Sequence, residues 1–135
     1  MKPNIYLDID GVLLINENTA APFADQFLQF ILDNSPNNTY WLTTHCWRGI
    51  NRTREVLAPA FDTKILNMLS VVKPTDWNTA KTDAIDFTKP FLWFDDDLYP
   101  EERAVLEAHN ALDCHILIDL YKNPNQLKEI VSLFA

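Results

Sequence analysis

Residues 5–14, with the sequence IYLDIDGVLL, constrain the fold more than any other part of the chain. The run is rich in branched and aromatic residues, which predicts a strand buried on both faces of a sheet. Because side chains alternate along a strand, Asp8 and Asp10 point to the same side. Gly11 then allows a tight turn, so both carboxylates lie at the carboxyl end of the strand, where open α/β sheets bind ligands. An Asp beside a glycine also binds the backbone amides of turns, so this segment alone leaves a purely structural role open.

The rest of the chain alternates between helical and strand-like patterns. Apolar residues recur at helical spacing in residues 22–32, 48–57, 79–87, 100–109 and 123–134. Short apolar runs lie at residues 40–43, 69–72, 91–94 and 115–118. Such alternation is typical of α/β proteins with a mostly parallel sheet. We therefore expect an α/β fold, a three-layer Rossmann-like sandwich around a mostly parallel five-stranded sheet.

Length and composition indicate one globular domain over residues 1–135. With 47% hydrophobic residues, a chain of 135 residues can bury roughly two thirds of its unfolded surface. The balance of 19 acidic and 11 basic residues gives a net charge of -8, which works against broad attraction to nucleic acid or to an anionic membrane. No apolar stretch approaches the roughly 20 residues of a membrane span, and the first residues do not resemble a signal sequence. We therefore expect a cytoplasmic protein that does not contact a membrane.

Three later features follow predicted strands or begin a predicted helix. Thr43 and Thr44 follow the strand at 40–42 and offer a hydroxyl and a backbone amide suited to phosphate oxygens, although a threonine-rich turn that caps a helix has the same sequence. Lys81 lies in the first turn of the predicted helix 79–87, where a cation needs an anionic partner. Residues 95–97 are three adjacent aspartates at the end of a strand. Adjacent carboxylates repel one another, so a divalent cation is the expected compensation.

In this order, the four features resemble the motifs of the haloacid dehalogenase-like (HAD) hydrolase superfamily. The first motif, a hydrophobic strand followed by Asp-x-Asp-Gly-Val, matches residues 8–12. Thr43 matches the second motif and Lys81 the third. Asp95 and Asp96 match the paired acids of the fourth motif.

The resemblance implies a Mg²⁺-dependent phosphatase. In that family the first aspartate, here Asp8, attacks phosphorus and becomes an aspartyl phosphate, and the second, Asp10, protonates the leaving oxygen and later activates water. Thr43 and Lys81 would hold the transferring oxygens. Thr44, Gly11 and His45 are further candidates for substrate contact. Mg²⁺ would be held by Asp8, the backbone carbonyl of Asp10, Asp95 and Asp96, with the choice between Asp96 and Asp97 left open.

Asp10 favours a phosphatase over a dehalogenase, because a halide leaves without a proton while an ester oxygen needs one. The stretches 14–40 and 44–80 leave no room for a large cap domain, so we expect an open site unless residues 15–22 form a small flap. The substrate is then a phosphorylated small molecule or a phosphorylated end of a macromolecule. Two alternatives remain. One is a nucleotide or nucleic acid end phosphatase of the repair type, and the other is a noncatalytic HAD-fold module that binds a partner or a phosphorylated ligand.

Overall fold

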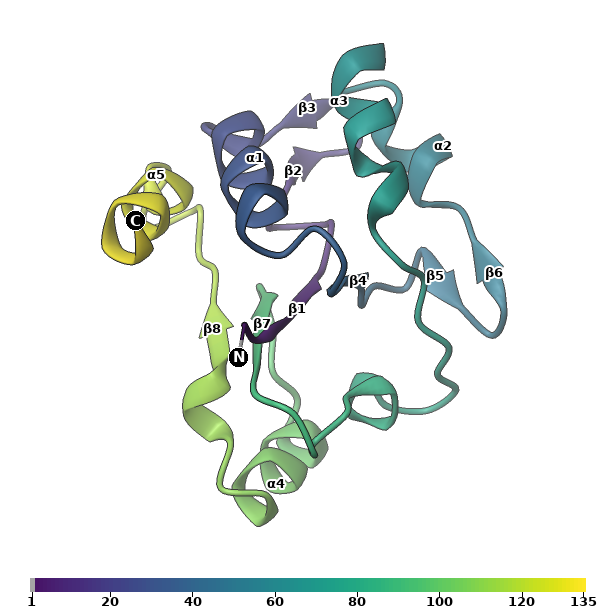
Figure 1. Cartoon of the computed structure of the whole chain (residues 1–135), viewed down its shortest axis with the longest axis vertical. Helices are drawn as coiled ribbons and strands as arrows, with labels where there is room; N and C mark the ends of the chain where they lie inside the picture. The colour runs from purple at the N-terminus through teal and green to yellow at the C-terminus, as the bar shows by residue number, and fades with distance from the viewer. Residues whose placement is uncertain (1) are drawn as a thin grey trace.

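The computed structural model describes residues 2–135 and shows an α/β fold around a four-stranded parallel sheet. Its strands are β1 (Asn4–Leu7), β4 (Thr39–Trp41), β7 (Phe91–Asp95) and β8 (His115–Leu117). They lie in the order β4-β1-β7-β8, with β1 and β7 at the centre (Figure 1). The chain moves from β1 to β4 on one side and later to β7 on the other. Ligands of open α/β sheets bind where the strand order reverses in this way.

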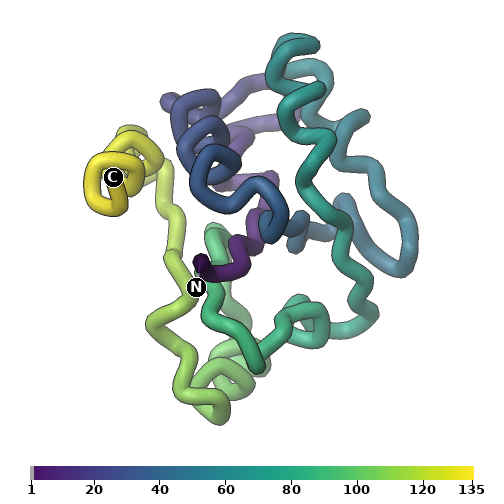
Figure 2. The backbone as a smooth tube through the Cα atoms, in the orientation of Figure 1, coloured from purple at the N-terminus to yellow at the C-terminus, as the bar shows by residue number. Residues whose placement is uncertain are grey.

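Helices surround this sheet, as Figure 1 shows. The α-helices are α1 (Ala24–Asn34), α2 (Thr53–Leu57), α3 (Thr63–Met68), α4 (Pro100–Ala108) and α5 (Gln126–Phe134). Short 3-10 helices are η1 (Leu69–Val71), η2 (Lys81–Ala84) and η3 (Leu112–Cys114). Helices α1 and α5 pack together, and α4 packs against η2. The backbone trace in Figure 2 shows the C-terminal helix on the outside and the N-terminal strand in the interior of the fold.

Two small antiparallel hairpins extend from the sheet. The first joins β2 (Leu14–Asn16) to β3 (Thr19–Ala20), and the second joins β5 (Cys46–Trp47) to β6 (Ile50–Asn51). The first hairpin lies within the stretch considered for a small flap, residues 15–22, apart from its first residue. It begins directly after the turn that follows β1, and the N–H groups of Val12, Leu13 and Leu14 in this turn donate to the carbonyl of Ile9.

Both faces of β1 are buried, as its sequence predicts. Ile5 and Leu7 belong to one hydrophobic cluster, which also contains residues of α1 and α5. Tyr6 points into a second cluster with Trp93 and with Leu106 of α4. Alternation along one strand therefore fills two separate cores, and these cores fix the strand from both sides.

The structure corrects three of the expected elements. Residues 69–71 form the 3-10 helix η1, and only Lys73 pairs with β4, through a single parallel bridge to Tyr40. The next bond of this pairing would run to the carbonyl of Trp41, which instead accepts from the hydroxyl of Thr75, so the described residues form a sheet of four strands. Residues 79–87 contain only the short helix η2.

The third correction concerns residues 48–57, where we expected one helix. The segment begins with the β5–β6 hairpin, and α2 starts only at Thr53. Arg48 and Gly49 have φ values of 51° and 78°, and two successive positive φ angles are typical of a two-residue hairpin turn. The helices expected at 22–32, 100–109 and 123–134 and the strand at 115–118 are confirmed, with ends shifted by a few residues. Within residues 2–135, no helix combines the length and the apolar character that crossing a membrane requires.

Truncation of Leu7 tests the central position of β1. Leu7 is 0% exposed, whereas Leu133 on α5 is 78% exposed. We expect Leu7→Ala to lower the free energy of unfolding by about 2–5 kcal/mol, because it leaves a cavity in the core. The matched change Leu133→Ala should alter it by less than about 0.5 kcal/mol. Urea denaturation of both variants checks this, and equal losses would contradict the placement of β1.

Candidate active site

Asp8 lies immediately after β1, at the carboxyl edge of the sheet. Its backbone N–H donates to the carbonyl of Phe94 over 3.0 Å, which continues the pairing with β7 for one more residue. Its side chain accepts a hydrogen bond of 2.8 Å from the N–H of Ile9. The residue is 6% exposed, so a carboxyl group is held in a nearly dry position at the strand end.

Asp95 is the last residue of β7 and is 2% exposed. Its Oδ2 accepts from the indole Nε1 of Trp93 at 3.2 Å, and its Oδ1 accepts from the backbone N–H of Asp97 at 3.1 Å. These two donors fix the carboxyl group toward Asp8. Asp8 and Asp95 therefore meet because β1 and β7 are parallel neighbours.

Lys81 supplies the positive charge between these two acids. Its Nζ lies 2.7 Å from Oδ2 of Asp95 and 3.4 Å from Oδ2 of Asp8. Lys81 is the first residue of η2, so the anionic partner that the sequence required is found, although the helix is much shorter than expected. Burial lowers the pKa of Lys81, but Asp8 and Asp95 raise it by more, so the side chain stays charged.

One lysine does not neutralise this cluster, because Asp96 adds a third carboxylate. Oxygen atoms of Asp8, Asp95 and Asp96 all lie within 4.8 Å of one another. Burial and the nearby charge of Asp95 raise the pKa of Asp8 to about 8. The same two causes raise the pKa of Asp96 to about 6. Carboxylates gathered at this spacing are the oxygen ligands that Mg²⁺ prefers, and a bound cation would favour their charged forms.

Gly11 allows Asp96 to enter the cluster. Its φ is +77°, and a Cβ built on it would overlap the carboxyl group of Asp96. The glycine is therefore required both by its backbone conformation and by the close approach of this acid. Asp97, the other acid considered, does not belong to the group, and its Oδ1 accepts from the N–H of Leu98 instead.

The remaining predicted residues are divided between the pocket and its surroundings. A pocket of about 390 Å³ is lined by all the acids named above, by Lys81 and by Thr44. Thr43 is 0% exposed, and its hydroxyl accepts a 3.3 Å hydrogen bond from the N–H of His45. Asp10 is exposed and does not join the carboxylate cluster, because its Oδ2 lies 2.8 Å from Nε2 of His45.

Sequence patterns did not reveal several residues that complete the site. Trp93 is a fully buried residue of β7, and its indole N–H donates to Asp95. Glu102 lies in the first turn of α4, is 5% exposed and lines the pocket together with Tyr99 and Trp77. Burial raises the pKa of Glu102. An acid near the start of a helix is so common that its sequence position alone gives no sign of a place in the site.

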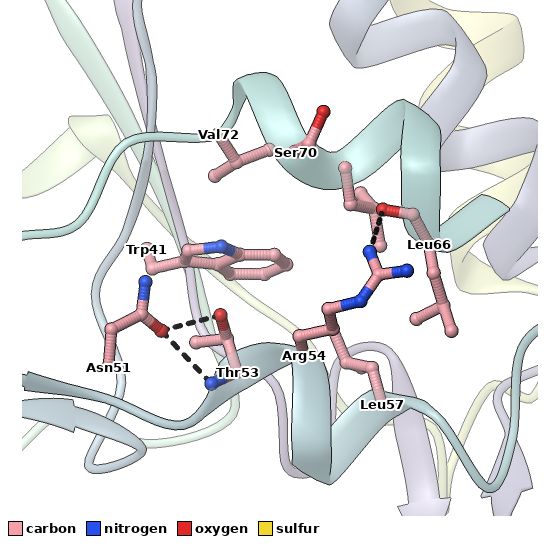
Figure 3. Close-up of a pocket in the computed structure, with 9 residues that line it drawn as sticks. Trp41, Asn51, Thr53, Arg54, Leu57, Leu66, Ser70 and Val72 are labelled. Carbon is pink, nitrogen blue, oxygen red and sulfur yellow. Dashed lines mark hydrogen bonds between the residues drawn. The ribbon is translucent and has the colours of Figure 1, made fainter. Parts of the chain in front are cut away.

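A second pocket, of about 140 Å³, lies between β4, α2 and η1 (Figure 3). It is bounded by the indole of Trp41, by Arg54 and by Ser70. The guanidinium of Arg54 is already engaged, since it donates to the carbonyl of Leu66 and to Oδ1 of Asn67, each over 3.2 Å. None of the clustered acids lines this pocket, so it is separate from the acidic cluster.

Comparison of the chain with protein-family models, with curated proteins and with solved structures finds no match. The function therefore has to be argued from the site itself.

Matched substitutions at the two glycines test the packing of Asp96. Gly49 has a φ of +78°, like Gly11, but a Cβ there would meet nothing within 4 Å. Gly49→Ala should therefore cost only the strain of the left-handed backbone, about 1–2 kcal/mol. Gly11→Ala should cost more and should also weaken Mg²⁺ binding, because Asp96 must move. Denaturation and calorimetric Mg²⁺ titration measure both effects, and equal Mg²⁺ affinities in the two variants would exclude this role for Gly11.

The pKa of Asp8 predicts how stability depends on pH in the protein without Mg²⁺. The folded chain keeps the proton of Asp8 up to about pH 8, whereas the unfolded chain releases it near the ordinary value of 3.8. The folded state thus binds more protons between these limits, and the free energy of unfolding falls as the pH rises through them. Denaturation in a chelator at a series of pH values should show this fall, and it should be smaller in Asp8→Asn. A fall of the same size in Asp8→Asn would disprove the assignment.

Proposed function

We propose that this chain is a Mg²⁺-dependent phosphomonoester hydrolase that forms an aspartyl phosphate on Asp8. The observation that carries the proposal is the position of Lys81, which bridges Asp8 and Asp95 at the reversal of strand order between β1 and β7. This arrangement combines a candidate nucleophile, a cation for phosphate oxygens and a set of metal-ligating carboxylates. The resemblance of the motifs to those of HAD hydrolases supports the same reaction.

The carboxylates fit a Mg²⁺ ion. Asp8, Asp95 and Asp96 would hold it, together with the backbone carbonyl of Asp10. Without a cation, a phosphate meets repulsion of about 4 kcal/mol for each pair of unit charges 4 Å apart at an effective dielectric constant near 20. Bound Mg²⁺ would neutralise charge on the phosphate and would let Asp8 release its proton. Lys81 would provide a second positive charge beside Asp8 and Asp95.

The chain's own residues then carry out two displacements. An oxygen of Asp8 attacks phosphorus and forms a bond to it, while the bond from phosphorus to the leaving oxygen breaks and Asp10 gives its proton to that oxygen. Water next attacks the same phosphorus, Asp10 takes up a proton from this water, and the bond between Asp8 and phosphorus breaks to release inorganic phosphate. Thr44, which lines the pocket, is proposed to hold phosphate oxygens. Thr43 is 0% exposed, and its hydroxyl accepts from the N–H of His45, so the contact with phosphate expected for Thr43 is not part of this proposal.

We also infer a three-layer arrangement and a fifth strand, as expected for a fold of this kind. The two hydrophobic clusters on opposite faces of β1 support a three-layer Rossmann-like arrangement. The single bridge between Lys73 and Tyr40 marks where a fifth strand would stand.

A nucleotide or nucleic acid end is the second candidate substrate, and an aromatic group beside the pocket favours it. Trp77 lines the pocket, and the centre of the Trp47 ring lies 6.2 Å from the centre of the Trp77 ring. The guanidinium of Arg48 lies 4.3 Å from the centre of the Trp47 ring. Aromatic and guanidinium groups of this kind stack on bases.

Phosphate release from a panel of substrates tests the proposed function. The panel contains an alkyl phosphate, an aryl phosphate, a nucleoside monophosphate, a phosphorylated oligonucleotide and a phosphopeptide. We expect Mg²⁺-dependent release from at least one of them, with loss of about 10³-fold or more in Asp8→Asn, because the nucleophile is removed. Asp25→Asn, the same change at an exposed position of α1, should retain full activity.

Release that is unchanged in Asp8→Asn would contradict the mechanism. Mg²⁺-independent binding of a phosphorylated ligand, without release from any member of the panel, would support the noncatalytic binding module instead.

A further inference from the structure

We infer that His45 is a positioning residue, which holds the carboxyl group of Asp10 in place for proton transfer to the leaving oxygen. This inference rests on the proposed function and adds to it a specific device for orienting the general acid. It differs from the role of substrate contact expected for His45 from the sequence.

The side chain of Asp10 has little else to hold it. Its relative exposure is 62%, and within residues 2–135 its carboxyl group makes one side-chain hydrogen bond, the 2.8 Å contact between its Oδ2 and Nε2 of His45. Asp8 and Asp95, by contrast, are buried and are each bound by Lys81 and by backbone or indole N–H groups. An exposed general acid with a single partner depends on that partner for its orientation.

His45 itself is fixed at both of its backbone polar groups. Its N–H donates to the hydroxyl of Thr43 over 3.3 Å, and its carbonyl accepts from the N–H of Arg52 over 2.8 Å. The next residue, Cys46, is 1% exposed and starts β5. The backbone between β4 and the β5–β6 hairpin is therefore held firmly enough to aim the imidazole ring across the site at Asp10.

Orientation matters most for esters whose leaving oxygen is strongly basic. When the bond between phosphorus and an alkyl oxygen breaks, the electron pair stays on that oxygen, and Asp10 must deliver its proton at the same time. A nitrophenolate leaves readily without a proton. In the first displacement, a group that only positions Asp10 should therefore affect alkyl esters strongly and nitrophenyl esters hardly at all, and misplacement by about 1 Å can cost a factor of about 10².

The test is a double-mutant cycle with two substrates, an alkyl phosphate and p-nitrophenyl phosphate. The four proteins are the wild type, His45→Ala, Asp10→Asn and the double variant. We expect His45→Ala to lower kcat/KM, which reports the steps up to departure of the leaving group, by about 10- to 100-fold for the alkyl ester and by less than about 3-fold for the nitrophenyl ester. In the Asp10→Asn background, His45→Ala should cause no further loss, because the group that it positions is absent. His45→Gln, which retains a terminal N–H donor, should restore part of the alkyl activity.

Two results would overturn the inference while leaving the proposed function intact. An equal rise of KM for both esters in His45→Ala would show that His45 binds the substrate phosphate. Independent losses that multiply in the double variant would show that His45 does not act through Asp10. If the wild type releases phosphate from neither ester nor from any other phosphate monoester in the presence of Mg²⁺, the proposed function fails and this inference fails with it. Circular dichroism and urea denaturation report that each variant is folded.

Discussion

The contacts of Lys81 with the two buried carboxyl groups of Asp8 and Asp95 are the interaction on which the site depends. Asp8 and Asp95 come from neighbouring parallel strands, so their separation is set by the sheet, and Lys81 reaches them from a short helix on a different segment. One ammonium group can balance only part of the charge once Asp96 joins the cluster. A buried charge without compensation is costly, and removing a single partner from such a group is strongly destabilising. The excess of carboxylates is therefore the physical reason to expect a divalent cation here.

The fold forms this site mainly by bringing side chains from separate segments close together. Both faces of β1 are covered, which fixes the strand and hence the direction in which Asp8 points. Gly11 adds the second requirement, because only a residue without a Cβ leaves room for Asp96. Asp10 differs from the other acids, since it is exposed and is oriented by one contact with the loop that follows β4. A firmly held Asp8 and an accessible Asp10 suit the proposed reaction, in which the substrate and then water must reach the same phosphorus.

Sequence patterns predicted the parts of the structure that depend on local order along the chain. The buried strands at 4–7 and 91–95, the helices at 24–34 and 100–108 and the meeting of Asp8 and Asp95 follow from alternation, spacing and strand ends. The contact of Lys81 with these acids was expected from the resemblance of the motifs. The helix expected at 79–87 fails because polar contacts compete with it: Asp86 accepts from the N–H of Thr88, and its own N–H donates to the hydroxyl of Tyr6, which is distant in sequence. Contacts of Trp93 with Asp95 and of His45 with Asp10 also lie beyond pattern reasoning, since they depend on where the loops place each side chain.

The most direct measurement is identification of the covalent intermediate. The protein is mixed with Mg²⁺ and an active phosphate ester, quenched in acid within the turnover time, digested and examined by mass spectrometry. The account predicts that the peptide containing residues 4–10 gains the mass of one phosphoryl group on Asp8 and that Asp8→Asn gains none. A phosphoryl group on a different residue, or steady release of phosphate with no modified peptide at any quench time, would contradict the account.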